Sequence, residues 1–243
     1  DGTIKEVKMI REEVAIEDTF ARSIIINGAN GKKYGFINLP SFNADFEDAK
    51  GRNASDDIKA ELIKLKAQNV EGIILDLRNN GGGSLTEVVD IMGLFMNSGP
   101  VVQVKDGNGR VQVMRNKQND PIWTGPLVIM QNELSASASE ILAGAMQDYG
   151  RAVIVGSPQS FGKGTVQTFV ELNRFLNTSD DFGALKLTIQ KFYRVNGKST
   201  QLKGVESDIP MKDVFSYEEI GERFDNYALP WDQVNSSSFT VNN

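Results

Sequence analysis

Serine and lysine are the candidates for covalent chemistry in this chain, because its 243 residues contain no histidine and no cysteine. The absence of histidine excludes every Ser-His mechanism within the chain, and the absence of cysteine excludes thiol chemistry. A serine nucleophile therefore needs another base. A lysine can serve when a dry site favours its neutral form, and Ser-Lys pairs are a known variant of the catalytic triad.

A cluster of serines, Ser135-Ala-Ser-Ala-Ser-Glu140, supplies the candidate nucleophile. Small residues at alternate positions permit a sharp turn that lifts one hydroxyl into a cleft, with the next amide pointing to the same space. Helix capping by Ser135 or Ser139 is the simpler explanation of such a cluster. Ser137 is flanked by alanine on both sides, which fits close approach of a substrate, but local chemistry does not choose among the three serines.

Lys163 is the candidate base, 26 residues after Ser137 and between two glycines. An exposed loop lysine is the simpler interpretation of this position. A phosphate-binding loop is the more specific alternative. Its sequence motif requires four residues between the first glycine and Gly-Lys-Ser/Thr. Here five residues separate the glycines at 156 and 162, and a glycine follows the lysine. Nucleotide binding is therefore not expected.

Three consecutive glycines, Gly81 to Gly83, come between a predicted strand and a predicted helix. Free N–H groups in such a loop can hold a carboxylate, a phosphate or a developing oxyanion. A tight turn from strand to helix explains a single glycine run equally well. The glycine run indicates a functional site only when it is considered together with the serine and lysine loops.

Short apolar strands alternate with helices along the chain, which indicates βαβ units and a mostly parallel sheet. The helices are expected after an N-cap at Ser55, with Ile58, Leu62 and Leu65 on its apolar face, and over residues 84–96 and 140–149. The strands are expected at 4–9, 14–16, 23–26, 33–39, 70–77, 101–104, 112–115, 126–130, 152–155, 165–172 and 184–193. The strands at 101–104 and 112–115 are expected to form a hairpin around the turn residues Asp106-Gly-Asn-Gly109. Sites in such sheets lie at the carboxyl ends of strands, so we expect the loops after residues 77, 130 and 155 to meet.

Several strings in the chain match one family pattern jointly: Leu75-Asp-Leu-Arg-Asn-Asn-Gly-Gly-Gly83, Ser135-Ala-Ser-Ala-Ser-Glu-Ile141, Phe161-Gly-Lys-Gly-Thr-Val-Gln167, Gln190-Lys-Phe-Tyr-Arg-Val-Asn-Gly197, Lys203-Gly-Val205, Asp208-Ile-Pro210 and Ala228-Leu-Pro-Trp231. Residues 71–211 resemble the catalytic domain of the tail-specific, or carboxyl-terminal processing, serine peptidases. The last string is similar to the segment after the protease core in the periplasmic branch. The resemblance implies an α/β fold with a ClpP/crotonase-like core of repeated ββα units, a β-rich N-terminal segment and an irregular C-terminal extension.

The resemblance also implies a role for individual residues. Ser137 matches the nucleophile, Lys163 the general base, and Gln167 the glutamine that orients the lysine. The backbone N–H groups of Gly83 and Ala138 match the oxyanion hole. Beyond these five, Asp148 lies in a matching string and is expected to support the site without taking part in the chemistry.

The implied activity is that of a serine endopeptidase that cleaves proteins with apolar C-terminal tails through an acyl-enzyme. The substrate would bind as an added β-strand. No cofactor or metal is implied, and an adaptor or regulator protein is left open. The implied location is the bacterial periplasm, with association with the inner membrane left open. Two alternatives are a catalytically inactive peptide-binding fragment and a crotonase-like acyl-CoA enzyme, which would not need the Ser-Lys pair.

The composition limits the classes of binding partner that we expect, because the net charge is −6 and no concentrated basic stripe is present. Nucleic acid and anionic membrane surfaces are therefore not expected.

The chain begins without methionine, and we expect it to be a piece of a longer protein. Residues 1–26 are expected to be the linker and exit strands of a missing PDZ domain, 27–211 the catalytic domain and 212–243 an extension. The loop 157–161 looks one residue longer than the family pattern, which could shift Lys163.

Overall fold

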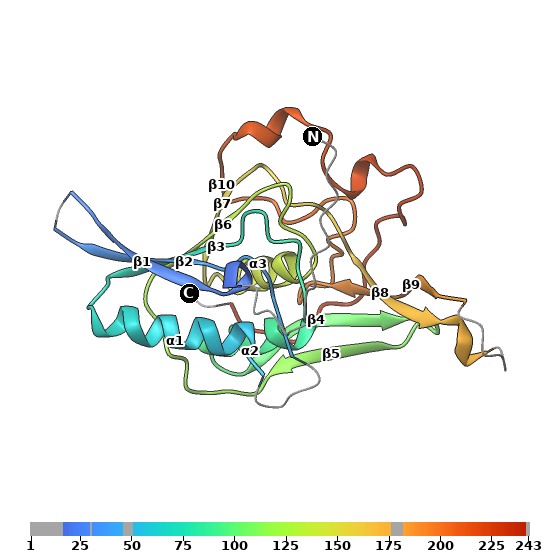
Figure 1. The fold of residues 1–243 in the computed structure, drawn as a ribbon, viewed down its shortest axis with the longest axis horizontal. Coiled ribbons are helices and arrows are strands. Elements are labelled where there is room, and N and C mark those ends of the chain that lie inside the picture. Colours follow the sequence, from blue (N-terminus) through green and yellow to red (C-terminus); the bar gives the residue numbers. More distant parts are fainter. Residues whose placement is uncertain (1–16, 30, 46–50, 176–181, 242–243) are drawn as a thin grey trace, which may run out of the picture.

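The computed structural model of the chain describes residues 17–29, 31–45, 51–175 and 182–241 (Figure 1). The strands predicted at 4–9 and 14–16 lie outside these residues. Within the described part, no helix is both long enough and apolar enough to cross a membrane.

A six-stranded sheet in the order β1-β2-β3-β6-β7-β10 forms one layer, and all its strands except β1 run parallel. Its strands are β1 (Arg22–Asn27), β2 (Lys33–Asn38), β3 (Gly72–Asp76), β6 (Leu127–Gln131), β7 (Val153–Gly156) and β10 (Ile209–Pro210). The expected mostly parallel α/β sheet is confirmed.

Strand β1 crosses the predicted boundary between residues 26 and 27. Every residue of β1, from Arg22 to Asn27, pairs with β2 in the antiparallel register. Residues 22–26 are therefore part of the first sheet, and their assignment to the exit strands of a preceding domain stays a prediction.

A second, antiparallel sheet has the order β5-β4-β9-β8 and includes the predicted hairpin. Its strands are β4 (Gly99–Asp106), β5 (Val111–Asn116), β8 (Thr165–Glu171) and β9 (Ala184–Tyr193). The helices are α1 (Ala54–Ala67), α2 (Leu85–Phe95) and α3 (Ala138–Asp148). Helix α1 packs on β1 and β2, α2 packs on β5, and α3 contacts β7 of the first sheet and β4 of the second. Helix α3 therefore lies between the two sheets.

The core forms where these layers meet. The predicted apolar face of α1 is confirmed, because Ile58, Leu62 and Leu65 are buried. The predicted N-cap at Ser55 is wrong, since Asn53 precedes the helix and Ser55 lies in its first turn. The N–H of Ser55 donates to Glu87 Oε2 of α2 at 2.7 Å. A carboxylate from the neighbouring helix α2 thus accepts the hydrogen bond of a first-turn N–H group, in place of the side chain of an N-cap residue.

The C-terminal extension is irregular, as expected, and contains the 3₁₀ helices η3 (Val214–Tyr217) and η4 (Glu222–Phe224). Two further 3₁₀ turns, η1 (Glu17–Thr19) and η2 (Leu172–Arg174), occur elsewhere. The extension returns to the core, where Trp231 Nε1 donates to Ser199 O at 2.9 Å and Phe239 packs edge-on against Tyr149.

Candidate active site

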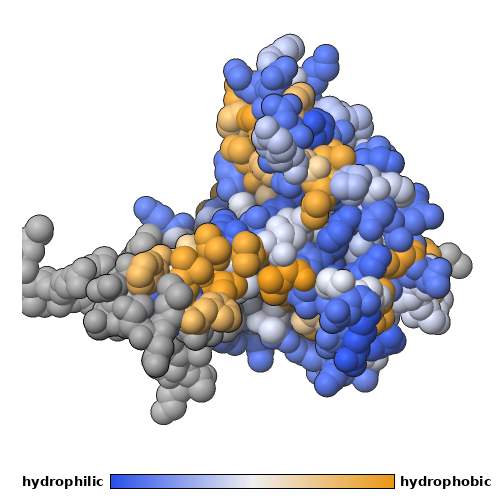
Figure 2. Space-filling model, turned by 90° about the vertical axis from the view of Figure 1, so that its right-hand side faces the viewer, coloured by the Kyte–Doolittle hydropathy of each residue, from blue (hydrophilic) through white to orange (hydrophobic). Residues whose placement is uncertain are grey.

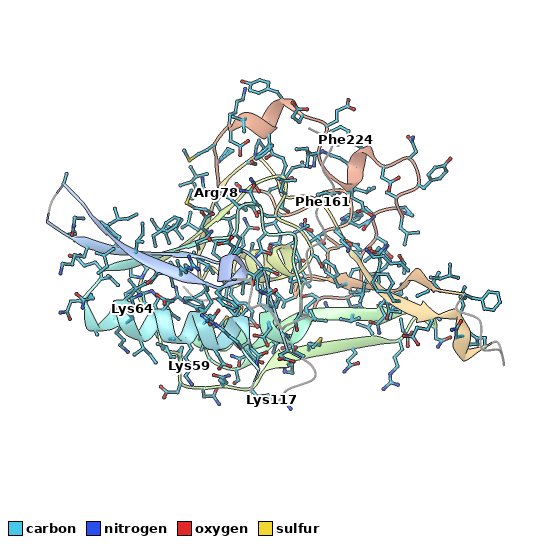
Figure 3. The ribbon with its side chains drawn as sticks, viewed as in Figure 1. Lys59, Lys64, Arg78, Lys117, Phe161 and Phe224 are labelled. Atoms are coloured by element: carbon cyan, nitrogen blue, oxygen red, sulfur yellow. The ribbon has the colours of Figure 1, made fainter. Side chains whose placement is uncertain are left out.

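The loops that follow β3, β6 and β7 converge, as the sequence predicts for the carboxyl ends of parallel strands. Phe161 N–H, after β7, donates to Ser135 O, after β6, at 3.0 Å. Ser135 Oγ in turn donates to Leu77 O, at the end of β3, at 2.8 Å. Figure 3 shows Arg78 and Phe161, from two of these loops, in the same part of the molecule above α1.

Ser137 stands apart from the other two serines of its cluster. Its backbone has φ 56° and ψ −109°, a conformation that non-glycine residues rarely adopt and that a sharp strand-to-helix turn requires. Ser135 and Ser139 are buried, and each donates its hydroxyl to a carbonyl of the preceding loop, Leu77 O and Asn80 O, both at 2.8 Å. These two serines hold the turn together, and Ser137 alone lines a cavity.

The glycine loop lies directly against this turn. Asn80 is fully buried and its Oδ1 accepts from the N–H of Gly82 at 2.9 Å, while its carbonyl accepts from the N–H of Ala136 at 3.0 Å. A Cβ atom at Gly82 would lie 2.9 Å from the Cβ of Ser137. Glycine is therefore required at this position for the two loops to meet.

Two backbone amides are available beside Ser137. Gly83 pairs with Phe42 in a parallel bridge that uses the flanking groups, since Phe42 N–H donates to Gly82 O and Ser84 N–H donates to Phe42 O. Among the described residues, neither the N–H of Gly83 nor that of Ala138 has an intramolecular acceptor. Both residues line the cavity, so the two amides can serve an oxyanion there.

Lys163 lines the same cavity as Ser137, and its Nζ donates to Gln167 Oε1 at 3.4 Å. In the described chain no hydrogen bond joins Ser137 and Lys163 directly. Catalytic hydrogen bonds are often long without substrate and tighten when it binds. The loop before Lys163 is anchored, since Ser160 N–H donates to Val205 O and Ser160 Oγ donates to Glu140 Oε1. The loop 157–161 thus leaves Lys163 at the cavity.

The cavity has a volume of about 230 Å³ and is lined by both polar and apolar residues. Its lining residues are Gly81, Gly83, Leu85, Ser137, Ala138, Ile141, Lys163, Thr165, Val166, Gln167, Lys186 and Phe192. Four larger cavities, of about 650, 700, 600 and 390 Å³, are lined by neither Ser137 nor Lys163. The chemistry therefore identifies the smaller cavity as the candidate site.

Glu140 connects the serine and lysine loops, and the sequence analysis assigned it no role. It is fully buried, and its Oε2 accepts from the N–H of Ser137 at 2.8 Å and from the N–H of Lys163 at 3.0 Å. Its Oε1 accepts from Gly162 N–H and Ser160 Oγ, both at 2.7 Å. One carboxyl group thus positions both candidate catalytic residues. The Ser-x-x-Glu spacing of a capping box was the available sequence signal.

Burial raises the pKa of Glu140 to about 7, even though the four donors around it favour the charged form. The group that joins the two loops therefore changes charge near neutral pH.

Asp76 and Arg78 form a second pair, for which the sequence pattern indicates no role. Arg78 donates from Nε to Asp76 Oδ1 at 2.9 Å and from Nη2 to Asp76 Oδ2 at 2.7 Å. The backbone N–H of Arg78 also donates to Asp76 Oδ1, at 3.0 Å. The buried carboxylate therefore shapes the first turn of the loop that leads to the glycines.

Asp148 does not line the candidate cavity. It lies at the end of α3 and pairs with Arg194, whose Nη2 is 2.5 Å from Asp148 Oδ1. Asn196 Nδ2 donates to the same oxygen at 2.8 Å. Its contacts therefore join α3 to the segment after β9. Among the described residues, no group of three or more His, Cys, Asp or Glu side chains is arranged to hold a metal ion.

Comparison with known proteins gives a consistent result. The model of peptidase family S41 matches residues 33–211. A tail-specific protease of Haemophilus influenzae is 43% identical over 239 residues, which are 98% of this chain and 33% of that protein. A carboxyl-terminal-processing protease of Picosynechococcus is 34% identical over 190 residues, covering 78% of this chain and 41% of that protein. The chain thus spans a third to two fifths of the length of these relatives.

Among solved structures, a photosystem II D1 C-terminal processing protease superposes with a TM-score of 0.66 at 28% identity. The match covers 83% of this chain and 50% of that one. An S41 protease from Bacteroides fragilis superposes with a TM-score of 0.63 at 18% identity, over 84% of this chain and 53% of that one, and shares the fold.

Proposed function

Because the chain belongs to peptidase family S41, we propose that it is the catalytic part of a serine endopeptidase that works through an acyl-enzyme. The observation that carries the proposal is the arrangement around Ser137. A serine in a strained turn lines one cavity with Lys163 and with two backbone amides that lack internal acceptors.

In the proposed reaction, neutral Lys163 Nζ accepts the proton of Ser137 Oγ as the oxygen bonds to the scissile carbonyl carbon. The N–H groups of Gly83 and Ala138 hold the resulting oxyanion, a contribution of roughly 2.7–4 kcal/mol per donor in comparable sites. The carbon–nitrogen bond then breaks, and Lys163 returns the proton to the leaving amine. Water, deprotonated by Lys163, releases the acyl group and restores Ser137. Gln167 orients the ammonium group through its Oε1.

The proposed substrates are proteins with apolar C-terminal tails. Leu85, Ile141, Val166 and Phe192 form the apolar part of the cavity wall, which suits an apolar side chain next to the scissile bond. The substrate backbone would add to a sheet edge as an extended strand. The H. influenzae relative is named a tail-specific protease, which supports substrates recognised by their tails. A location in the bacterial periplasm is part of the proposal. A regulator or adaptor protein is part of the same proposal.

The test is cleavage of a denatured protein with an apolar tail by the wild-type chain, Ser137→Ala and Lys163→Ala. Lys59→Ala on α1, far from the cavity, is the matched control. Labelling with a fluorophosphonate reports the nucleophile independently of substrate choice. We expect both site variants to lose cleavage and Ser137→Ala to lose labelling, with folding unchanged by circular dichroism.

Equal cleavage by all variants would contradict the proposed dyad. A folded wild-type chain that binds the tail but neither cleaves it nor reacts with the probe would instead support the inactive peptide-binding alternative.

A further inference from the structure

Lys186 lies on β9 directly opposite Phe169 of β8. Residues paired across antiparallel strands share a face, and so do residues two apart along one strand. Phe169 and Gln167 therefore lie on the same face of the hairpin as Lys186. Lys186 and Gln167 both line the cavity that contains Ser137 and Lys163. The hairpin thus extends one wall of the candidate active site.

The ammonium group of Lys186 has no anionic partner among the described residues. Its contact is with the ring of Phe169, whose centroid lies 5.9 Å from Nζ. By contrast Lys191, on the same strand, pairs with Asp232 and also donates to Pro230 O. An unpaired cation beside the reaction site, in a chain with net charge −6, can accept an anionic group from outside.

Phe169 gives this cation an apolar neighbour, because 70% of the phenylalanine is exposed. Figure 2, viewed from the side on which β8 and β9 lie in Figure 1, shows a band of hydrophobic residues on an otherwise largely hydrophilic face. A peptide leaving the cavity along the hairpin would therefore meet an aromatic surface next to a positive charge.

The proposed reaction determines which part of a substrate lies beside Lys186 and Phe169. Lys163 protonates the leaving amine, so the leaving segment begins on the side of Lys163 and its partner Gln167. Phe169 is two residues beyond Gln167, which corresponds to about 7 Å along a strand. An extended leaving segment would bring its second or third residue beside Lys186.

We propose that Lys186 and Phe169 form a subsite for the leaving segment that accepts a carboxylate. This inference rests on the proposed peptidase function. The carboxylate can be the free C-terminus of a short leaving segment or an acidic side chain, since both offer the same anionic oxygens. Lys186 is then a specificity-determining residue of the reaction.

The test uses three synthetic peptides with one apolar acyl segment and a three-residue leaving segment. In the first peptide the leaving segment ends in a free carboxylate, and in the second it ends in a carboxamide. In the third peptide it also ends in a carboxamide, and its third residue is aspartate. We measure kcat/KM for the wild-type chain, Lys186→Gln, Lys186→Glu and the control Lys59→Gln, which Figure 3 shows on α1, away from β8 and β9.

We expect the wild-type chain and Lys59→Gln to prefer a carboxylate peptide by about two- to fivefold, the range for exposed ion pairs. The preference should disappear in Lys186→Gln, reverse in Lys186→Glu and weaken in high salt. The first and third peptides distinguish a terminal carboxylate from an acidic side chain. Equal rates for all three peptides in the wild-type chain, unchanged by either variant, overturn the inference.

Binding separates this inference from the proposed reaction. In Ser137→Ala, with and without Lys186→Gln, fluorescence anisotropy gives the Kd of each labelled peptide. A carboxylate preference in Kd that depends on Lys186 supports the subsite even if the wild-type chain cleaves nothing. If neither Kd nor kcat/KM shows a preference for the carboxylate peptides, the subsite is refuted. The proposed cleavage reaction is not affected by that result.

Discussion

Glu140→Gln tests whether one buried carboxyl group sets both the geometry and the pH response of the site. The wild-type carboxyl has four donors around it, two on each oxygen. A glutamine amide has one oxygen and one NH₂ group, so it can serve two of these donors fully. Ser160 Oγ can rotate to accept from the NH₂ group, which leaves the glutamine oxygen for the N–H groups of Ser137 and Lys163. The N–H of Gly162 and the hydroxyl hydrogen of Ser160 then lose this acceptor.

The magnitude follows from the pKa of Glu140, which burial raises from an ordinary 4.5 to about 7. The folded state holds this proton more tightly than the unfolded state, so the free energy of unfolding falls as pH rises from about 4.5 to about 7. At 1.36 kcal/mol per pH unit, ionisation of this group costs the folded wild type about 3 kcal/mol. Glutamine does not ionise, but the unpaired Gly162 N–H costs the variant about 1–3 kcal/mol at every pH.

The assay is urea unfolding at pH 5 and pH 7.5, followed by tryptophan fluorescence, for the wild type, Glu140→Gln and the exposed control Glu219→Gln. We expect Glu140→Gln to be less stable than the wild type at pH 5, and the free energy of unfolding of the wild type relative to the variant to fall by about 2–3 kcal/mol by pH 7.5. Cleavage should fall less than tenfold, because both positioning bonds to Ser137 and Lys163 remain. A stability difference that does not change with pH would refute the reasoning.

Two further predictions concern backbone geometry and an ion pair. Gly83→Ala should lower kcat by about 10²–10³ because a Cβ at φ +143° would lie 2.3 Å from Phe42 O and displace an oxyanion donor. Gly109→Ala, a positive-φ glycine with open space around it, is the control and should leave kcat unchanged. Asp148→Asn should destabilise the chain by about 1–3 kcal/mol in urea unfolding through its partly buried partner Arg194, with kcat/KM within twofold. A tenfold loss of kcat/KM at unchanged stability would instead assign Asp148 to the reaction.

The sequence predicted most of the elements because their signals are local. The spacing of Ile58, Leu62 and Leu65 gave the buried face of α1, and the hairpin of β4 and β5 followed from its turn residues. The exposure of the alternating residues Leu185 and Leu187 on β9 did not follow from their spacing. Alternation places side chains on one face of a strand, but only neighbouring layers determine whether that face is covered.

The edge strand β1 shows the same limit at a domain boundary. Its residues have a strand pattern in the sequence, but that pattern did not show that they pair with β2. Strand propensity does not state which sheet a strand joins, because pairing partners are chosen by tertiary contacts.

The candidate chemistry was a property of the sequence itself, because a chain without histidine or cysteine leaves serine and lysine for covalent catalysis. Which of three serines faces the cavity was decided by the tertiary structure, where Ser135 and Ser139 donate to carbonyls 58 and 59 residues away. Glu140 likewise reaches a loop more than 20 residues further on. Hydrogen bonds between segments far apart in the chain leave no local pattern, so only the folded chain places these groups together.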